Sequence, residues 1–180
     1  SKNIANTIEE DGQVNSHIWT SLNNYIIQVE EITKGLSEVN PENASIYTEN
    51  KENYISKLQE IKEKYDTELA NIKGKKAICL NEALTYIAEE VGLEITSVKT
   101  DHEESSLSAE MIKSLIDKMN LEGIKIILVD SEDDLRNAQT LASETGAEIY
   151  KLNSGLTGSM DKNAYINIMN ENLEQFKKMQ

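Results

Sequence analysis

Cysteine and proline are almost absent from this chain. Among its 180 residues there is one cysteine, Cys79, and one proline, Pro41. A single thiol excludes a disulfide within the chain. Because Cys79 lies in the apolar run of residues 77–80, we expect a buried thiol that packs as a small hydrophobic side chain.

Long apolar runs and basic residues are also scarce. No stretch approaches the roughly 20 apolar residues that a membrane-spanning helix needs. Lys and Arg number 18 against 32 Asp and Glu, which gives a net charge of −14. A nucleic-acid surface needs clustered basic residues to displace counterions from phosphates. The composition therefore argues against a nucleic-acid partner and favours cations.

The N-terminal part of the chain divides into a leader and a helical hairpin. Residues 1–15 are polar and acidic and show no periodic apolar face, which predicts a flexible leader. In residues 16–74, apolar side chains recur at steps of three and four, the spacing of one helical face. Asn40 and Pro41 favour a helix restart, because Asn caps free amides and Pro suits the first helical position. We therefore predict one helix over residues 44–73, about 45 Å long at 1.5 Å per residue.

Residues 75–180 alternate between short apolar segments and helical ones. Three helical stretches each end at a glycine and lead into a segment rich in Ile, Val or Leu, the pattern of βαβ units. The predicted fold class is α/β: a long helical spine, then a C-terminal lobe with a four-stranded parallel sheet flanked by helices. The predicted strands cover residues 76–80, 94–99, 124–129 and 147–152, and the predicted helices cover residues 84–91, 109–121, 133–145 and 165–179.

Polar residues follow these predicted strands. In an open parallel sheet, ligands bind where loops leave the carboxyl ends of the strands. Asn81, Asp130 and Asn153 come directly after three of the strands, and the acidic stretch 100–104 follows the other. An asparagine at such a junction also serves as a cap or turn residue, because its side chain accepts hydrogen bonds from the backbone. Ligand and turn roles are therefore both open for Asn81 and Asn153.

Five motifs, in the same order along the chain, resemble the zinc- and manganese-type solute-binding proteins of bacterial ABC transporters. His17-Ile18-Trp19 is similar to the family's Asp-Pro-His-x-Trp segment, and Asn40-Pro41-Glu42-Asn43 to its D-P-E-N restart before the spine helix. The other three are the segment 74–88 that opens the C-terminal lobe, the T-L-A-x-E-T-G-A pattern at 140–147, and the closing helix at 165–173. The resemblance implies two α/β lobes joined by one long helix, with this chain holding the spine and the C-terminal lobe.

The resemblance also implies a metal site and a transport function. Members of the family hold a metal ion between the lobes, and the matching ligand positions here are His17, Asn81 and Asn153. A further ligand would come from the N-terminal lobe, which is missing from this chain. The implied function is that of an extracytoplasmic zinc- or manganese-binding component of an ABC transporter. Such a component is not an enzyme, is anchored as a lipoprotein at the outer face of the cytoplasmic membrane, and works with a permease.

Two of the three positions depart from the family's ligands. The family has His or Glu where this chain has Asn81, and Asp where it has Asn153. Zinc prefers imidazole, thiolate or carboxylate ligands, whereas an amide oxygen is neutral and less basic. One imidazole and two amides therefore predict weak binding of zinc or manganese by this chain. His102, within the acidic stretch 101–104, is the only other histidine, and we interpret it as part of a solvated loop.

Two other functions fit part of the pattern. Asp130 follows a predicted central strand, as the phosphoacceptor of a receiver-like signalling domain does. A receiver also needs acidic residues after its first strand to hold Mg²⁺, where this chain has Asn81 and Glu82. The second alternative is an interaction or scaffold lobe that binds no metal. Because the spine carries an apolar stripe built to pack on a partner, we expect the isolated chain to form a homo-oligomer.

Overall fold

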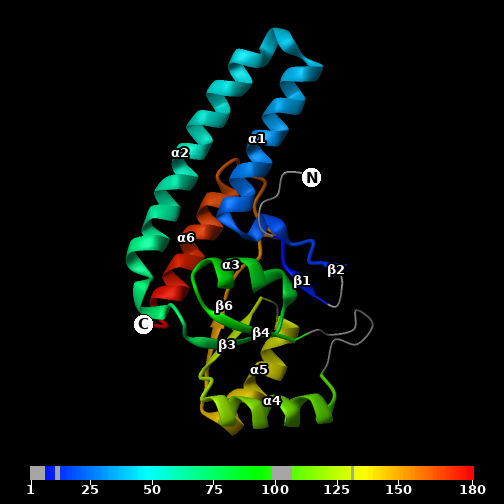
Figure 1. The fold of residues 1–180 in the computed structure, drawn as a ribbon, viewed down its shortest axis with the longest axis vertical. Coiled ribbons are helices and arrows are strands. Elements are labelled where there is room, and N and C mark those ends of the chain that lie inside the picture. The colour runs from blue at the N-terminus through cyan, green and yellow to red at the C-terminus, as the bar shows by residue number, and fades with distance from the viewer. Residues whose placement is uncertain (1–6, 11–12, 99–106, 131) are drawn as a thin grey trace.

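A long helical hairpin projects from a layered α/β body in the computed structural model of this protein (Figure 1). The structure describes residues 7–10, 13–98, 107–130 and 132–180. Helices α1 (Leu22–Val39) and α2 (Ala44–Glu68) form the hairpin, and α6 (Ala164–Lys177) packs against α2. The sheet lies at the other end of the molecule from the hairpin's turn.

Four parallel strands form the sheet, in the order β4-β3-β5-β6. β3 (Lys76–Cys79) pairs with β4 (Glu94–Ser97) on one side and with β5 (Ile126–Val129) on the other, and β6 (Glu148–Lys151) pairs with β5. Parallel neighbours need crossover connections, which the intervening helices supply. The predicted α/β class and four-stranded parallel sheet are confirmed.

Helices cover both faces of the sheet, and alternate strand residues pack on opposite sides. Ala77 and Cys79 belong to the core cluster that includes α2, α3 and α6, whereas Ile78 belongs to the cluster under α4 and α5. This alternation follows from the two-residue period of a strand. The sheet helices other than α6 are α3 (Thr85–Glu90), α4 (Ala109–Glu122) and α5 (Glu132–Thr145).

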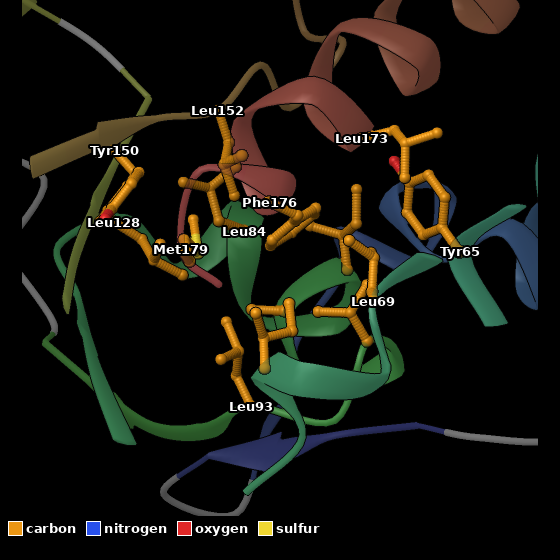
Figure 2. Packing of buried hydrophobic residues seen from close by; sticks show 14 of the residues in the cluster. Tyr65, Leu69, Leu84, Leu93, Leu128, Tyr150, Leu152, Leu173, Phe176 and Met179 are labelled. Carbon is orange, nitrogen blue, oxygen red and sulfur yellow. The ribbon is translucent and has the colours of Figure 1, made fainter. Parts of the chain in front are cut away.

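Phe176 of α6 lies at the centre of the core between the sheet and α2. Figure 2 shows it surrounded by apolar side chains from the sheet, α2 and the neighbouring helical turns. Its ring is fully buried and meets Tyr65 of α2 edge to face, with 6.0 Å between the ring centroids. The Tyr65 hydroxyl donates a 2.7 Å hydrogen bond to the Met169 carbonyl, so α2 and α6 are joined by polar as well as apolar contacts.

The spine helix is shorter than the sequence predicts. α2 ends at Glu68, and residues Ala70–Ile72 form the 3-10 helix η3 instead of a continuing α-helix. Leu69 and Ile72 are both fully buried. In a 3-10 helix, side chains three residues apart lie on the same side, so the tighter winding turns both into the core. The apolar spacing of three looked helical in the sequence and gave no sign of this change.

A short antiparallel hairpin occupies part of the stretch that we predicted to be a flexible leader. β1 (Glu9–Glu10) pairs with β2 (Gln13–Val14). The Ile8 amide donates to the Tyr86 hydroxyl at 2.9 Å, and that hydroxyl donates to the Asn15 carbonyl at 2.9 Å. The hairpin is therefore attached to α3, at the edge of the region described next. Among the described residues, no helix is long and apolar enough to cross a membrane.

Candidate metal site

Three loops meet at the carboxyl edge of the sheet. They follow β3, β5 and β6, and the segment before α1 lies against them through a set of hydrogen bonds. This segment contains the 3-10 helix η1 (Ile18–Thr20), and the loop after β3 contains the 3-10 helix η4 (Glu82–Leu84). The edge is therefore built from parts of the chain that are far apart in sequence.

His17 lies at the start of η1 with its side chain 18% exposed. Its Nδ1 atom is 2.9 Å from Asn15 Oδ1 and 3.9 Å from Glu82 Oε1. Its ring is 5.3 Å from the Trp19 ring, centroid to centroid. Nε2 has no hydrogen-bond or ion-pair partner in the part of the chain that the structure describes. This nitrogen is therefore available to a ligand.

Asn81 lies in the loop after β3 and caps η4. Its Oδ1 accepts a 3.0 Å hydrogen bond from the Ala83 amide, and its Nδ2 donates to Asp134 Oδ2 at 3.3 Å. An amide oxygen has two lone pairs, so one remains for another partner. The capping role that the sequence left open is present, and the oxygen keeps one free position.

Asn153 has the same arrangement after β6. Its Oδ1 accepts a 2.8 Å hydrogen bond from the Gly155 amide, which closes a turn at a residue with a φ of 75°. Its own backbone amide and carbonyl bond to the side chain of Asn172 at 2.8 and 2.9 Å. Asn172 belongs to α6 and is buried, and these two hydrogen bonds hold the backbone of the loop after β6 against that helix.

Asp130 and Ser154 join the loops after β5 and β6. The Asp130 carboxylate accepts hydrogen bonds from the Ser154 hydroxyl at 2.6 Å and from the Ser154 amide at 3.1 Å. The Asp130 amide in turn donates to Asp134 Oδ2 at 3.2 Å, the same oxygen that Asn81 contacts. One chain of hydrogen bonds thus runs from the loop of Asn81 to the loop of Asn153.

Trp19 fixes the segment before α1 to the loop after β6. Its Nε1 donates to the Ser154 carbonyl at 2.9 Å, and its own carbonyl accepts from the Tyr165 hydroxyl at 2.8 Å. Burial raises the pKa of the Tyr165 hydroxyl well above its usual value, so it stays a neutral donor. His17, two residues before Trp19, is placed by these contacts beside the carboxyl edge of the sheet.

The side chains that contact the predicted ligands were missing from our sequence-based site. Asn15, Asp134 and Ser154 hydrogen-bond to His17, Asn81 and Asp130. Asn15 stands at the position of the Asp in the Asp-Pro-His-x-Trp segment, a signal that could have found it, whereas no periodicity or motif marks Asp134 or Ser154. A cavity of about 420 Å³ lies beside the site and is lined in part by Asp130, Asn153 and Glu171.

The donor set at this edge is poor in the groups that metals prefer. Within residues 7–10, 13–98, 107–130 and 132–180, no three His, Cys, Asp or Glu side chains gather closely enough to hold a metal ion. The edge offers one imidazole nitrogen, two amide oxygens and the nearby carboxylate of Glu82. The carboxylates of Asp130 and Asp134 are also there, and both already accept hydrogen bonds from the loops. His102 and the acidic stretch around it lie outside the described residues.

Comparisons with known proteins identify the family. The family described as zinc-uptake complex component A, periplasmic (ZnuA), matches residues 2–179. The high-affinity zinc uptake system protein ZnuA of Bacillus subtilis (strain 168) is 33% identical over 168 residues, which cover 89% of this chain and 52% of that protein. The manganese ABC transporter substrate-binding lipoprotein PsaA of Streptococcus mitis is 26% identical, over 92% of this chain and 55% of that protein.

A solved structure shows the same fold. The manganese complex of the solute-binding protein FpvC from Pseudomonas aeruginosa has a TM-score of 0.84 at 24% identity, covering 98% of this chain and 66% of that one. This chain spans about half the length of these two curated relatives. The relatives are named as uptake or substrate-binding proteins, in agreement with the prediction that this is not an enzyme. With a match across residues 2–179, the chain belongs to the ZnuA family of periplasmic zinc-uptake components.

Proposed function

We propose that this chain forms the spine and C-terminal lobe of an extracytoplasmic solute-binding component that delivers zinc or manganese to an ABC transporter permease. His17, Asn81 and Asn153 face the transported metal in this proposal. A further lobe outside these 180 residues supplies the remaining ligand, a proposal supported by the greater length of the relatives. Membrane anchoring is proposed by analogy with the relative named as a lipoprotein.

The free Nε2 of His17 is the observation that carries this proposal. Its segment is bonded to the loops of both asparagines, through Glu82 on one side and through Trp19 and Ser154 on the other. Imidazole nitrogen is a preferred ligand of zinc and of most first-row transition metals. Because the two amides add no charge, we propose an altered site with weak affinity when this chain acts alone.

Replacing His17 with alanine tests the proposed site. We expect His17→Ala to weaken zinc binding by more than about tenfold, because it removes the one imidazole of the site. Isothermal titration of the full 180-residue chain with zinc measures the effect. The matched control is His102→Ala, which removes the other histidine of the chain and none of the three proposed ligands. Loss of zinc binding in the control, together with unchanged binding in His17→Ala, would move the site to the acidic stretch at 101–104.

The receiver-like alternative gains no support from the surroundings of Asp130. Both of its carboxylate oxygens accept hydrogen bonds from Ser154, which suits a residue that ties two loops together. The scaffold alternative rests on a different observation, the apolar surface near the turn of the hairpin. Ile32, Leu36 and Val39 follow each other on one face of α1 and are 61%, 46% and 87% exposed, and Ile46 of α2 is 53% exposed.

We expect these four residues to drive self-association of the isolated chain, since association removes their side chains from water. Light scattering at high micromolar concentration should give at least a dimer. Ile32→Glu together with Val39→Glu should shift the chain to a monomer, because charges at the centre of an apolar contact are costly to desolvate. A control pair on the sheet helices, Met111→Glu with Leu121→Glu, should leave the mass unchanged. A monomeric parent would rule out this association.

A further inference from the structure

Asn15 is a buried residue that contacts His17 twice. It lies between β2 and η1 along the chain, and the residue is only 7% exposed. Asn15 Oδ1 is 3.0 Å from the backbone nitrogen of His17 and 2.9 Å from the ring atom Nδ1. Asn15 Nδ2 is 2.9 Å from the backbone oxygen of Glu82. One amide therefore joins the metal-facing imidazole to the loop that carries Asn81.

Backbone groups fix the orientation of this amide. The oxygen and nitrogen of an asparagine side chain have similar shapes, so their assignment rests on their partners. The His17 backbone N–H can only donate, which requires the Asn15 oxygen beside it. The Glu82 carbonyl can only accept, which requires the Asn15 NH₂ group beside it. Both requirements give the same orientation, without any assumption about the imidazole.

The orientation of the amide determines which ring nitrogen carries the proton. Because Asn15 Oδ1 can only accept, Nδ1 of a neutral His17 must be the donor in their 2.9 Å contact. The other nitrogen, Nε2, then has a free lone pair. We propose that Asn15 is a positioning residue that holds His17 as the Nδ1–H tautomer and so makes Nε2 the atom that binds the metal ion. This inference rests on the function proposed above.

The group that accepts the Nδ1 proton also affects how tightly the His17 imidazole binds a metal ion. A partner that accepts the second ring proton raises the basicity of a metal-bound imidazole, and a carboxylate does so more than a neutral amide. The Glu82 carboxylate is 3.9 Å from Nδ1, beyond the reach of a hydrogen bond. Asn15 therefore orients the imidazole without the added basicity of a charged partner, and this keeps the affinity for metal modest.

Nitrogen-15 NMR of the imidazole tests the positioning directly, in metal-free protein at a pH where His17 is neutral. The parent should show the Nδ1–H tautomer. Asn15→Ala should give a mixture in which Nε2–H is the larger species, because that form prevails when no acceptor faces Nδ1. Asn15→Asp should restore Nδ1–H, because its carboxylate again accepts from the ring. A parent with Nε2–H, or an unchanged spectrum in Asn15→Ala, would overturn the inference.

Zinc titration of the same variants measures the consequence for binding. Asn15→Ala should weaken zinc binding by about 10- to 100-fold, the usual cost of removing the partner of a metal-bound histidine. Asn15→Asp should bind zinc at least as tightly as the parent. Equal weakening in Asn15→Asp and Asn15→Ala would contradict the proposed role.

Tyr86→Phe is the matched structural control. It removes the hydroxyl that bonds to the backbone of Asn15 and Ile8 and leaves the Asn15 side chain in place. We expect it to lower thermal stability and to leave the tautomer as Nδ1–H. A change of tautomer in Tyr86→Phe equal to that in Asn15→Ala would show a merely structural effect. If the parent has the Nδ1–H tautomer and binds no zinc, the proposed function fails and the positioning stands.

Discussion

Zinc should bind the double variant Asn81→Asp, Asn153→Asp about a hundredfold more tightly than the parent chain, a gain of roughly 3 kcal/mol. Each aspartate has the shape of the asparagine it replaces and keeps an oxygen for the capped backbone amide, Ala83 in one case and Gly155 in the other. The gain comes from two added negative charges at positions that we propose face the cation, since carboxylate is a far better zinc ligand than neutral amide. Isothermal titration measures it.

In the absence of metal, the single variants Asn81→Asp and Asn153→Asp should differ in melting temperature. Asn81 Nδ2 is 3.3 Å from Asp134 Oδ2, so Asn81→Asp brings two carboxylates together and should lower the melting temperature. Added zinc should reverse this loss, because the cation binds only the folded site. Asn71→Asp is the matched control, since it adds the same charge at an exposed residue of η3 that is not one of the proposed ligands. Equal tightening in the control would mean that overall charge, and not the site, controls binding.

Phe176→Ala should destabilise the fold by about 3–5 kcal/mol, the usual cost of removing a fully buried aromatic ring. The ring is fully buried and fills the space between α2 and the sheet. The loss is large because removing the ring leaves a cavity among packed side chains that can relax only in part. Urea denaturation followed by circular dichroism gives the free energy of unfolding.

Phe176→Leu is the graded control and should cost less, since much of the apolar volume remains. A cost below about 1 kcal/mol for Phe176→Ala would show that this part of the core is loosely packed. The same measurement at saturating zinc should leave the difference between parent and variant in place, because Phe176 lies in the core and does not line the cavity beside the proposed site.

The sheet could be predicted from sequence because its signals are local. Apolar segments of four to six residues, each preceded by a helix that ends at a glycine, mark βαβ units, and Gly92, Gly123 and Gly146 have the positive φ that such helix ends require. The β1 and β2 strands, each two residues long, are too short to show a period. These two strands are held in place by hydrogen bonds between the backbone of Ile8 and Asn15 and the hydroxyl of Tyr86, more than 70 residues away.

The candidate site also has residues that the sequence predicts and contacts that only the folded structure shows. The places of Asn81 and Asn153 at strand ends follow from the pattern of the sheet, and His17 was found through resemblance because a lone histidine carries no local signal. The contacts that orient these residues join distant segments. Asp134 could not be found from the sequence, because its role depends on which atoms the folded loops bring within hydrogen-bonding distance of it. Asn15 stands at the Asp position of the Asp-Pro-His-x-Trp segment, but only the folded structure shows that its side chain contacts the His17 ring.

Trp19 gives this protein an internal optical probe of the proposed metal site. It is the only tryptophan in the chain, its indole N–H is bonded to the Ser154 carbonyl, and its ring is 5.3 Å from the His17 imidazole. Ultraviolet fluorescence excited at the indole therefore originates beside the proposed metal ligand and reports on the charge and position of that imidazole. We expect binding of a metal ion at the proposed site to change this emission in unlabelled protein, with the seven tyrosines as the background.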